Sequence, residues 1–210
     1  MNSMEKSDPS ITEIPRLLLA AGGSRRMGKP KALLPWGDRT LIEHQIRTLL
    51  QTDQPVVVVL GAQAERIQHI ASMYPVRVRV HENWKAGMGS SISFGISRLT
   101  ELFPAAAGAL IAILDQPLLR YTHFEKMDQI FQPGAKRIIV SRSASGWQGV
   151  PVLFDSCYFK SLQSLTGEEG AKKIIRQHPK AVTLVECGEL LDDMDTPQAY
   201  ERLKTYLKKP

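Results

Sequence analysis

Residues 17–31 are the most informative part of the sequence and read Leu17-Leu18-Leu19-Ala20-Ala21-Gly22-Gly23-Ser24-Arg25-Arg26-Met27-Gly28-Lys29-Pro30-Lys31. An apolar run ends abruptly in two glycines, which four cationic residues follow. A buried strand that opens into a glycine-rich loop exposes backbone N–H groups, and such groups hold phosphate together with Arg and Lys side chains. The stretch therefore predicts a nucleotide-binding loop after the first strand of an α/β domain.

Two familiar phosphate-binding loops do not fit this stretch. Residues 23–29 follow the first seven positions of a P-loop, but Pro30 stands where that loop needs a Ser or Thr hydroxyl for magnesium. A dinucleotide fingerprint needs glycines spaced G-x-G-x-x-G and an acidic residue about 20 positions later. Residues 22–26 do not supply that spacing.

Short β-rich runs alternate with helical patterns along the chain. Strands are predicted at residues 16–21, 56–60, 76–80 and 108–114, and helices at 41–50, 64–71, 90–102 and 123–131. This alternation indicates a parallel sheet with helices on both faces. Later strands at 137–141 and 150–154 predict an antiparallel edge. They are followed by helices at 156–165 and 169–177, a strand at 182–186 and a last helix from Thr196. We therefore expect an α/β fold of three layers with a mostly parallel, Rossmann-like sheet.

Length and composition favour one domain. The chain has 210 residues and a net charge of +6, and we expect residues 1–15 to form a polar N-terminal extension and 16–208 a single domain. No apolar run reaches the roughly 18 residues of a membrane span, and the first residues lack the order of a signal peptide. The cations are not interleaved with aromatics as in nucleic-acid-binding proteins. We expect a cytoplasmic protein with an anionic small substrate, without membrane or nucleic-acid partners.

The opening loop also carries a longer pattern, L-A-A-G-x-S-x-R-M-G-x-x-K. It is matched by Leu19, Ala20, Ala21, Gly22, Ser24, Arg26, Met27, Gly28 and Lys31. In this pattern the sequence resembles the nucleotidyltransferase superfamily, and most closely the molybdenum cofactor cytidylyltransferases, which are related to molybdopterin guanylyltransferases. The resemblance implies a sheet of the nucleotide-diphospho-sugar transferase type. It also implies Mg²⁺-dependent transfer of a nucleoside monophosphate from a nucleoside triphosphate to a phosphorylated acceptor.

Two acidic segments are candidate metal sites. Asp115 ends the apolar run 109–114, where a carboxylate can hold Mg²⁺ against a triphosphate, although an Asp before a Pro-containing turn is more often a cap or turn former. The resemblance, through D-x-P, implies that Asp115 is a magnesium ligand. Asp193 and Asp195 match the family's D-x-D-T-P segment, which implies that Asp195 is the second ligand and leaves Asp193 as a further candidate. Capping of the last helix by Asp195 is the alternative role.

Residues 87–91 resemble the family's G-M-G-x-S segment, which contributes to the nucleotide site, and Asn83 is a candidate contact for base or ribose or else a turn residue. The candidate nucleotide-binding residues are Leu19, Ala20, Ala21, Gly22, Gly23, Ser24, Lys31, Asn83, Gly87, Met88, Gly89, Ser90 and Ser91. The candidate catalytic residues are Arg26, Lys31 and Asp115. In this picture the two cations stabilise the charge that develops as pyrophosphate leaves.

The resemblance also indicates substrates. L-A-A-G in place of the guanylyltransferases' L-A-G-G favours CTP over GTP, and the acceptor is expected to be a molybdopterin-type phosphate, with a molybdoenzyme as a candidate partner. Val150 stands where the family has the His of G-H-P, and Glu168 where it favours the Asp of G-D-x-G, so acceptor recognition is expected to differ there. The alternatives are a molybdenum cofactor carrier without turnover, and a guanylyltransferase or another small-acceptor nucleotidyltransferase.

Overall fold

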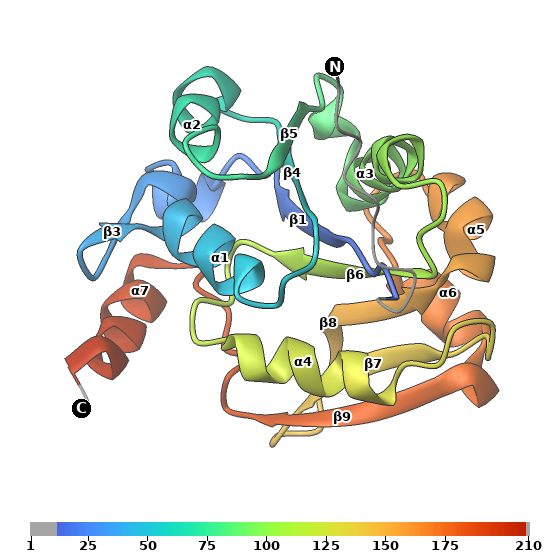
Figure 1. Ribbon diagram of the computed structural model, residues 1–210. Helices are drawn as coiled ribbons and strands as arrows, with labels where there is room; N and C mark the ends of the chain where they lie inside the picture. Colours follow the sequence, from blue (N-terminus) through green and yellow to red (C-terminus); the bar gives the residue numbers. More distant parts are fainter. Residues whose placement is uncertain (1–11, 209–210) are drawn as a thin grey trace, which may run out of the picture.

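A seven-stranded sheet with the order β5-β4-β1-β6-β8-β7-β9 forms the centre of the molecule in the computed structural model, which describes residues 12–208 (Figure 1). Its strands are β1 (Arg16–Ala20), β4 (Val56–Leu60), β5 (Arg77–Val80), β6 (Gly108–Ile113), β7 (Ile138–Ser143), β8 (Gln148–Asp155) and β9 (Val182–Gly188). The helices are α1 (Leu41–Leu50), α2 (Ala64–Ala71), α3 (Met88–Leu102), α4 (Tyr121–Ile130), α5 (Phe159–Gln163), α6 (Lys172–Gln177) and α7 (Pro197–Lys204). A small hairpin, β2 (Pro35–Trp36) and β3 (Arg39–Thr40), precedes α1.

The pairing of the strands confirms the expected mostly parallel sheet. β1 pairs in parallel with β4 and β6, and β4 pairs in parallel with β5. The antiparallel pairs are those of β8 with β6 and with β7, while β9 runs parallel to β7. The antiparallel strand, β8, therefore lies in the half of the sheet where an antiparallel edge was predicted, and β7 and then β9 follow it toward the outer edge.

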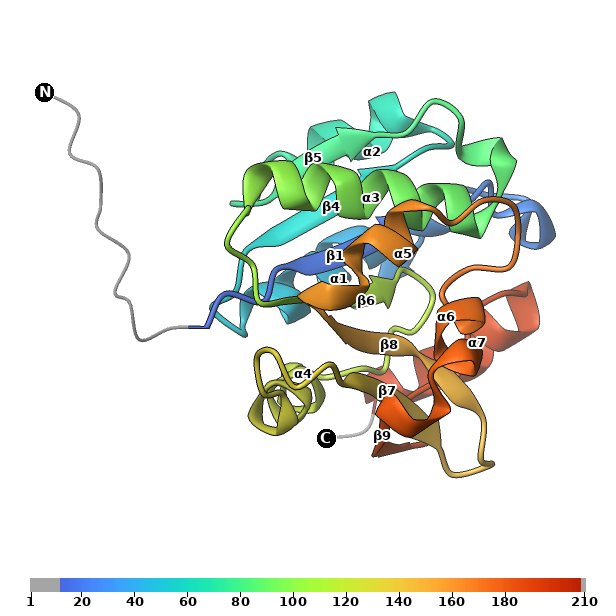
Figure 2. The same ribbon diagram turned by 90° about the vertical axis from the view of Figure 1, so that its right-hand side faces the viewer.

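Side chains of the buried strands alternate between two cores. Leu18 of β1 packs into the core beneath α1, α2 and α4, whereas Leu17 packs into the core beneath α3, α5 and α6. Figure 2 shows these helices on opposite faces of the sheet. Burial on both faces explains why β1, β4 and β6 are continuous apolar runs.

The described chain enters β1 through buried residues. Ile14 is 3% exposed, and its N–H donates to the side chain of Gln54. The Glu13 carbonyl accepts from the N–H of Ala107. Of the predicted extension, residues 1–15, only residues 12–15 belong to the described part of the chain.

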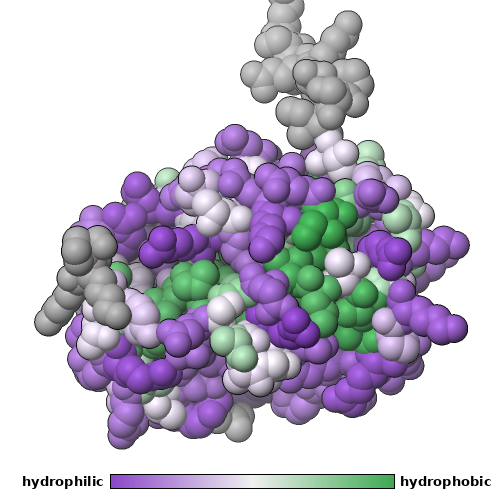
Figure 3. Space-filling model, turned by 90° about the horizontal axis from the view of Figure 1, so that it is seen from below, coloured by the Kyte–Doolittle hydropathy of each residue, from purple (hydrophilic) through white to green (hydrophobic). Residues whose placement is uncertain are grey.

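The surface seen from the β9 side is mainly polar, with apolar patches between the polar side chains (Figure 3). Within residues 12–208, no helix has the length and apolar character needed to cross a membrane.

Arg16, the first residue of β1, is a buried cation with a side-chain exposure of 0%. Its guanidinium donates to both carboxylate oxygens of Asp128 on α4, at 2.9 Å to Oδ1, and its Nε donates to Thr52 Oγ1 at 3.1 Å. Planar two-point pairing of this kind satisfies a guanidinium that water cannot reach. The pair joins the central strand to α4 across 112 residues.

Asp128→Ala should lower the free energy of unfolding by roughly 3 kcal/mol, because it leaves the Arg16 charge buried without its carboxylate. Urea denaturation measures the change. Glu101→Ala is the control, because it removes the exposed Arg98–Glu101 pair and should cost less than about 1 kcal/mol. Equal effects of the two substitutions would contradict a structural role for the Arg16 pair.

Candidate active site

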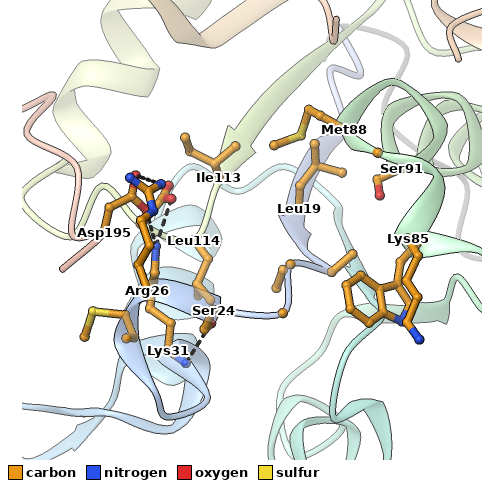
Figure 4. Close-up of a pocket in the computed structure, with 18 of the residues that line it drawn as sticks. Leu19, Ser24, Arg26, Lys31, Lys85, Met88, Ser91, Ile113, Leu114 and Asp195 are labelled. Atoms are coloured by element: carbon orange, nitrogen blue, oxygen red, sulfur yellow. Dashed lines mark hydrogen bonds and ion pairs between the residues drawn. The ribbon is translucent and has the colours of Figure 1, made fainter. Parts of the chain in front are cut away.

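A cavity of about 420 Å³ opens at the carboxyl ends of β1 and β6, the edge at which open α/β sheets bind ligands. Figure 4 shows Arg26, Lys31 and Asp195 at one end of it and Met88, Ser91 and Lys85 at the other. The lining residues are Leu19, Ala20, Ala21, Gly22, Gly23, Ser24, Arg26, Met27, Lys31, Trp84, Lys85, Gly87, Met88, Ser91, Ile113, Leu114, Asp115, Glu168 and Asp195.

The loop after β1 turns sharply to bring Lys31 back to the sheet. Ser24 has a left-handed backbone, φ 50°, and its carbonyl accepts from the N–H of Met27 at 3.0 Å. The Ser24 hydroxyl accepts from the backbone N–H of Lys31, also at 3.0 Å. The loop is therefore closed on itself, and the Lys31 side chain, only 9% exposed, points into the cavity.

Lys31 Nζ joins the two carboxylates that the sequence singled out. It donates to Asp115 Oδ2 at 3.0 Å and to Asp195 Oδ1 at 2.7 Å. Arg26 binds the other oxygen of Asp195 at 2.7 Å. Three segments far apart in the sequence thus meet in one ion cluster.

Backbone contacts position the two aspartates. The N–H of Met194 donates to the carbonyl of Asp115 at 2.8 Å, which places the segment before α7 against the end of β6. Gln45 of α1 is buried and donates to the carbonyls of Leu114 and Gln116 on either side of Asp115. The carboxylates are therefore held by rigid elements before any ligand binds.

The environment shifts the pKa values of the acidic groups in opposite directions. Burial raises the pKa of Asp115, and the attraction of Lys31 offsets only part of that shift. Burial also acts to raise the pKa of Asp195, but the hydrogen bond and charge of Lys31 and the charge of Arg26 outweigh it, so this pKa is lowered. Burial and the charges of Asp115 and Asp195 raise the pKa of Asp193 to about 6. A cation entering here would relieve the repulsion among these groups.

Trp84 lines this cavity and also a second one of about 470 Å³. Its indole fits where glycines leave room: a Cβ on Gly61 would lie 2.7 Å from Trp84 Cβ, and one on Gly23 would lie 3.1 Å from the ring. The second cavity is lined by Lys29, Gln63 and Ile67 among others.

Comparison with known proteins gives the family. Residues 16–182 match the MobA-like NTP transferase domain. The chain belongs to this family. One relative, nicotine blue oxidoreductase of Paenarthrobacter nicotinovorans, is 33% identical over 93% of this chain and 98% of its own. Another, the molybdenum cofactor cytidylyltransferase of Escherichia coli, is 23% identical over 90% of this chain and 95% of its own.

Solved structures show the same fold. Rv0371c from Mycobacterium tuberculosis has a TM-score of 0.81 at 27% identity, covering 92% of this chain and 99% of that one. A complex of Rv0371c with manganese has a TM-score of 0.77 at 26% identity, covering 92% and 99%. The CTP:phosphocholine cytidylyltransferase of Streptococcus pneumoniae, 16% identical with a TM-score of 0.67 over 93% and 99%, shares the fold. The sheet is thus of the nucleotide-diphospho-sugar transferase type.

Most predicted site residues of this MobA-like chain lie on the first cavity, but Asn83, Gly89 and Ser90 do not line it. Asn83 begins the 3-10 turn Trp84–Ala86 and is exposed. The Ser90 hydroxyl is hydrogen-bonded to His81 Nε2 at 2.9 Å. The sequence reasoning missed Trp84 and Lys85, although an aromatic residue beside a cation in the segment before residues 87–91 was a usable signal.

Gly87 and Gly89 have a packing role that the sequence did not indicate. The N–H of Gly89 donates to the carbonyl of Gly167 at 2.8 Å. A Cβ on Gly87 would lie 2.5 Å from that carbonyl oxygen, and one on Gly89 would lie 2.6 Å from the carbonyl oxygen of Thr166. The start of α3 therefore needs glycine so that the segment between α5 and α6 can sit against it.

Gly89→Ala should destabilise the fold by about 1 to 2 kcal/mol, because the overpacking exceeds the gain in helix propensity. Gly22→Ala is the matched control for stability, since a Cβ there meets no atom within 4 Å. Calorimetric melting of both variants measures the difference. A Gly89→Ala protein as stable as the wild type would show that residues 166–168 do not pack on α3 as described.

Proposed function

We propose that this protein transfers CMP from CTP to a phosphorylated acceptor of the molybdenum cofactor type and releases pyrophosphate. The observation that carries the proposal is the Lys31 amine, which lies at the end of the loop after β1 and is held between Asp115 and Asp195. Membership of the MobA-like family supports nucleotidyl transfer. The cytidylyltransferase relative and the L-A-A-G loop support the cytidyl group and the acceptor class.

The donor set at this cluster fits Mg²⁺. Asp115 and Asp195 supply hard carboxylate oxygens, and Mg²⁺ is usually bound by one or two carboxylates together with substrate phosphates. Asp115 Oδ1 is buried and has no hydrogen-bond partner among residues 12–208, so this oxygen is free to coordinate a cation. The manganese complex of Rv0371c supports a divalent ion in this fold family. Bound Mg²⁺ would supply charge neutralisation at the α-phosphate.

The protein's own residues would position the substrates and neutralise their negative charge. An acceptor phosphate is already an anion at neutral pH, so no side chain needs to remove a proton from the nucleophile. Backbone N–H groups of the loop after β1 and the cations Arg26 and Lys31 would orient the triphosphate. Negative charge grows on the leaving pyrophosphate, and Lys31, held in place by two carboxylates, is pre-organised to stabilise it.

Incubation with labelled nucleotide, Mg²⁺ and molybdenum cofactor tests the proposal. CTP should give the cytosine dinucleotide form of the cofactor and pyrophosphate, and calorimetry should show tighter binding of CTP than of GTP. Dinucleotide formed from GTP instead would favour guanylyl transfer. Cofactor binding without pyrophosphate release would favour a carrier, and reduction of nicotine blue in a parallel assay would place the chain with its oxidoreductase relative.

Lys31→Ala should lower kcat by about a hundredfold or more while the Kd for CTP changes less, because the cation acts most strongly on charge that develops in the transition state. Lys29→Ala is the matched control from the same loop, since Lys29 is exposed and lines only the second cavity. Single-turnover kinetics separate the two quantities. Unchanged kcat with weaker binding would move Lys31 to a ground-state role.

A further inference from the structure

The segment that carries Asp115 leaves the sheet before the aspartate is reached. β6 ends at Ile113, and a hydrogen bond of 3.2 Å from the N–H of Leu114 to the carbonyl of Leu19 extends its pairing with β1 by one residue. Residues 114–117 follow the paired registers of β6 with β1 and with β8. The backbone around Asp115 therefore depends on partners outside the sheet.

The side chain of Gln45, on α1, supplies two of these partners. Gln45 is 2% exposed, and its amide nitrogen donates to the carbonyl of Leu114 at 3.2 Å and to that of Gln116 at 2.9 Å. These two carbonyls belong to the residues on either side of Asp115. One buried side chain thus spans the aspartate and fixes the backbone before and after it.

The other two carbonyls of this segment are also bound. That of Asp115 accepts from the N–H of Met194 at 2.8 Å, and that of Pro117 accepts from His44 Nε2 at 2.9 Å. All four carbonyls of residues 114–117 therefore have donors, and α1 supplies the donors for three of them. The helix acts as a template on which this segment is held.

The carboxylate of Asp115 is held less firmly than its backbone. Lys31 Nζ donates to Oδ2 at 3.0 Å, whereas Oδ1 is buried without a hydrogen-bond partner in the described part of the chain. A charged ligand that takes Lys31 as its partner weakens the first of these contacts. The backbone bonds then decide where the carboxylate points.

We propose that Gln45 is a positioning residue, which orients Asp115 toward a bound divalent cation. The inference rests on the proposed function, because that function gives the cation to Asp115. The amide of Gln45 suits this task, since one nitrogen supplies two N–H donors and brings no charge. A cationic side chain in its place would attract the carboxylate and compete with the metal ion. Gln45 fixes the backbone and leaves Oδ1 open.

Binding of Mn²⁺ tests the inference without turnover. The EPR signal of the free ion gives the Kd for Mn²⁺ of the full chain, with and without a non-hydrolysable CTP analogue. Gln45→Met keeps the length and the helix propensity of the side chain but removes both donors. It should weaken Mn²⁺ binding about tenfold to a hundredfold, the range found when a residue that orients a metal ligand is lost. Asp115→Asn, which changes the ligand itself, should bind Mn²⁺ at least as weakly.

Gln54→Met is the matched control. Gln54 also binds backbone through its amide, since it accepts from the N–H of Ile14 at 2.8 Å and donates to the carbonyl of Thr12 at 3.2 Å. It lies where β1 and β4 begin, at the edge of the sheet opposite to Asp115. Its loss should lower the melting temperature and leave the Kd for Mn²⁺ within about twofold, because distant sites act independently.

A second variant covers the case in which Gln45→Met does not fold. Gln45→Asn keeps the amide but shortens the side chain by one methylene, so we expect it to reach only one of the two carbonyls. Its Kd for Mn²⁺ should lie between those of the wild type and Asp115→Asn. A folded Gln45→Asn protein with the wild-type Kd would overturn the inference.

The outcomes separate this inference from the proposed function. Mn²⁺ binding that depends on Gln45, in a protein that transfers no nucleotide, upholds the inference and refutes the proposed transfer. A Gln45→Met protein with a lower melting temperature and an unchanged Kd for Mn²⁺ refutes the inference alone, because Gln45 then serves stability only. Equal weakening by Gln45→Met and Gln54→Met also refutes it, as does a wild type that binds no Mn²⁺ in the presence of the CTP analogue.

Discussion

The Lys31 ammonium held between Asp115 and Asp195 is the interaction on which the site depends. It joins the loop after β1, the end of β6 and the segment before α7, which are separated by 84 and 164 positions from Lys31. A buried cation is tolerated because two carboxylates compensate it, and two neighbouring carboxylates are tolerated because a cation lies between them. A charged ligand that enters this cluster must therefore exchange partners with the groups already paired there.

A second constraint concerns space rather than charge. Gly87 and Gly89 let the segment carrying Glu168 sit against the start of α3, and Gly23 and Gly61 leave a slot for the indole of Trp84. The small residues of the G-M-G segment thus act between two parts of the protein as well as beside the cavity. Because the α3 start lines the cavity through Met88 and Ser91, its packing also fixes the shape of that part of the cavity.

The sequence predicted the sheet well for a physical reason. Strands buried on both faces, such as Val56–Leu60, must be apolar throughout, and that signal is local. The loop after β1 was equally readable because its glycines and cations are contiguous. The roles of Ser90 and Trp84 could not be predicted in this way. Ser90 is hydrogen-bonded to His81, and Trp84 packs against Gly23 and Gly61, and only the fold brings these partners together. Roles set by long-range packing leave no periodic trace in a sequence.

Family membership leaves the chemistry of the acceptor open for a related reason. The relatives of this chain include proteins named as an oxidoreductase and as a cytidylyltransferase, so the shared sheet does not by itself select a reaction. The cluster at Lys31 gathers charged groups at one end of the cavity, where Lys31 is hydrogen-bonded to Asp115 and Asp195 and Arg26 to Asp195. Residues at the opposite end, where Glu168 and Trp84 line the cavity, are placed to meet the part of a ligand that the cluster does not reach. Substrate choice can then change at that end through single side chains, while the ion cluster and the fold that holds it remain the same.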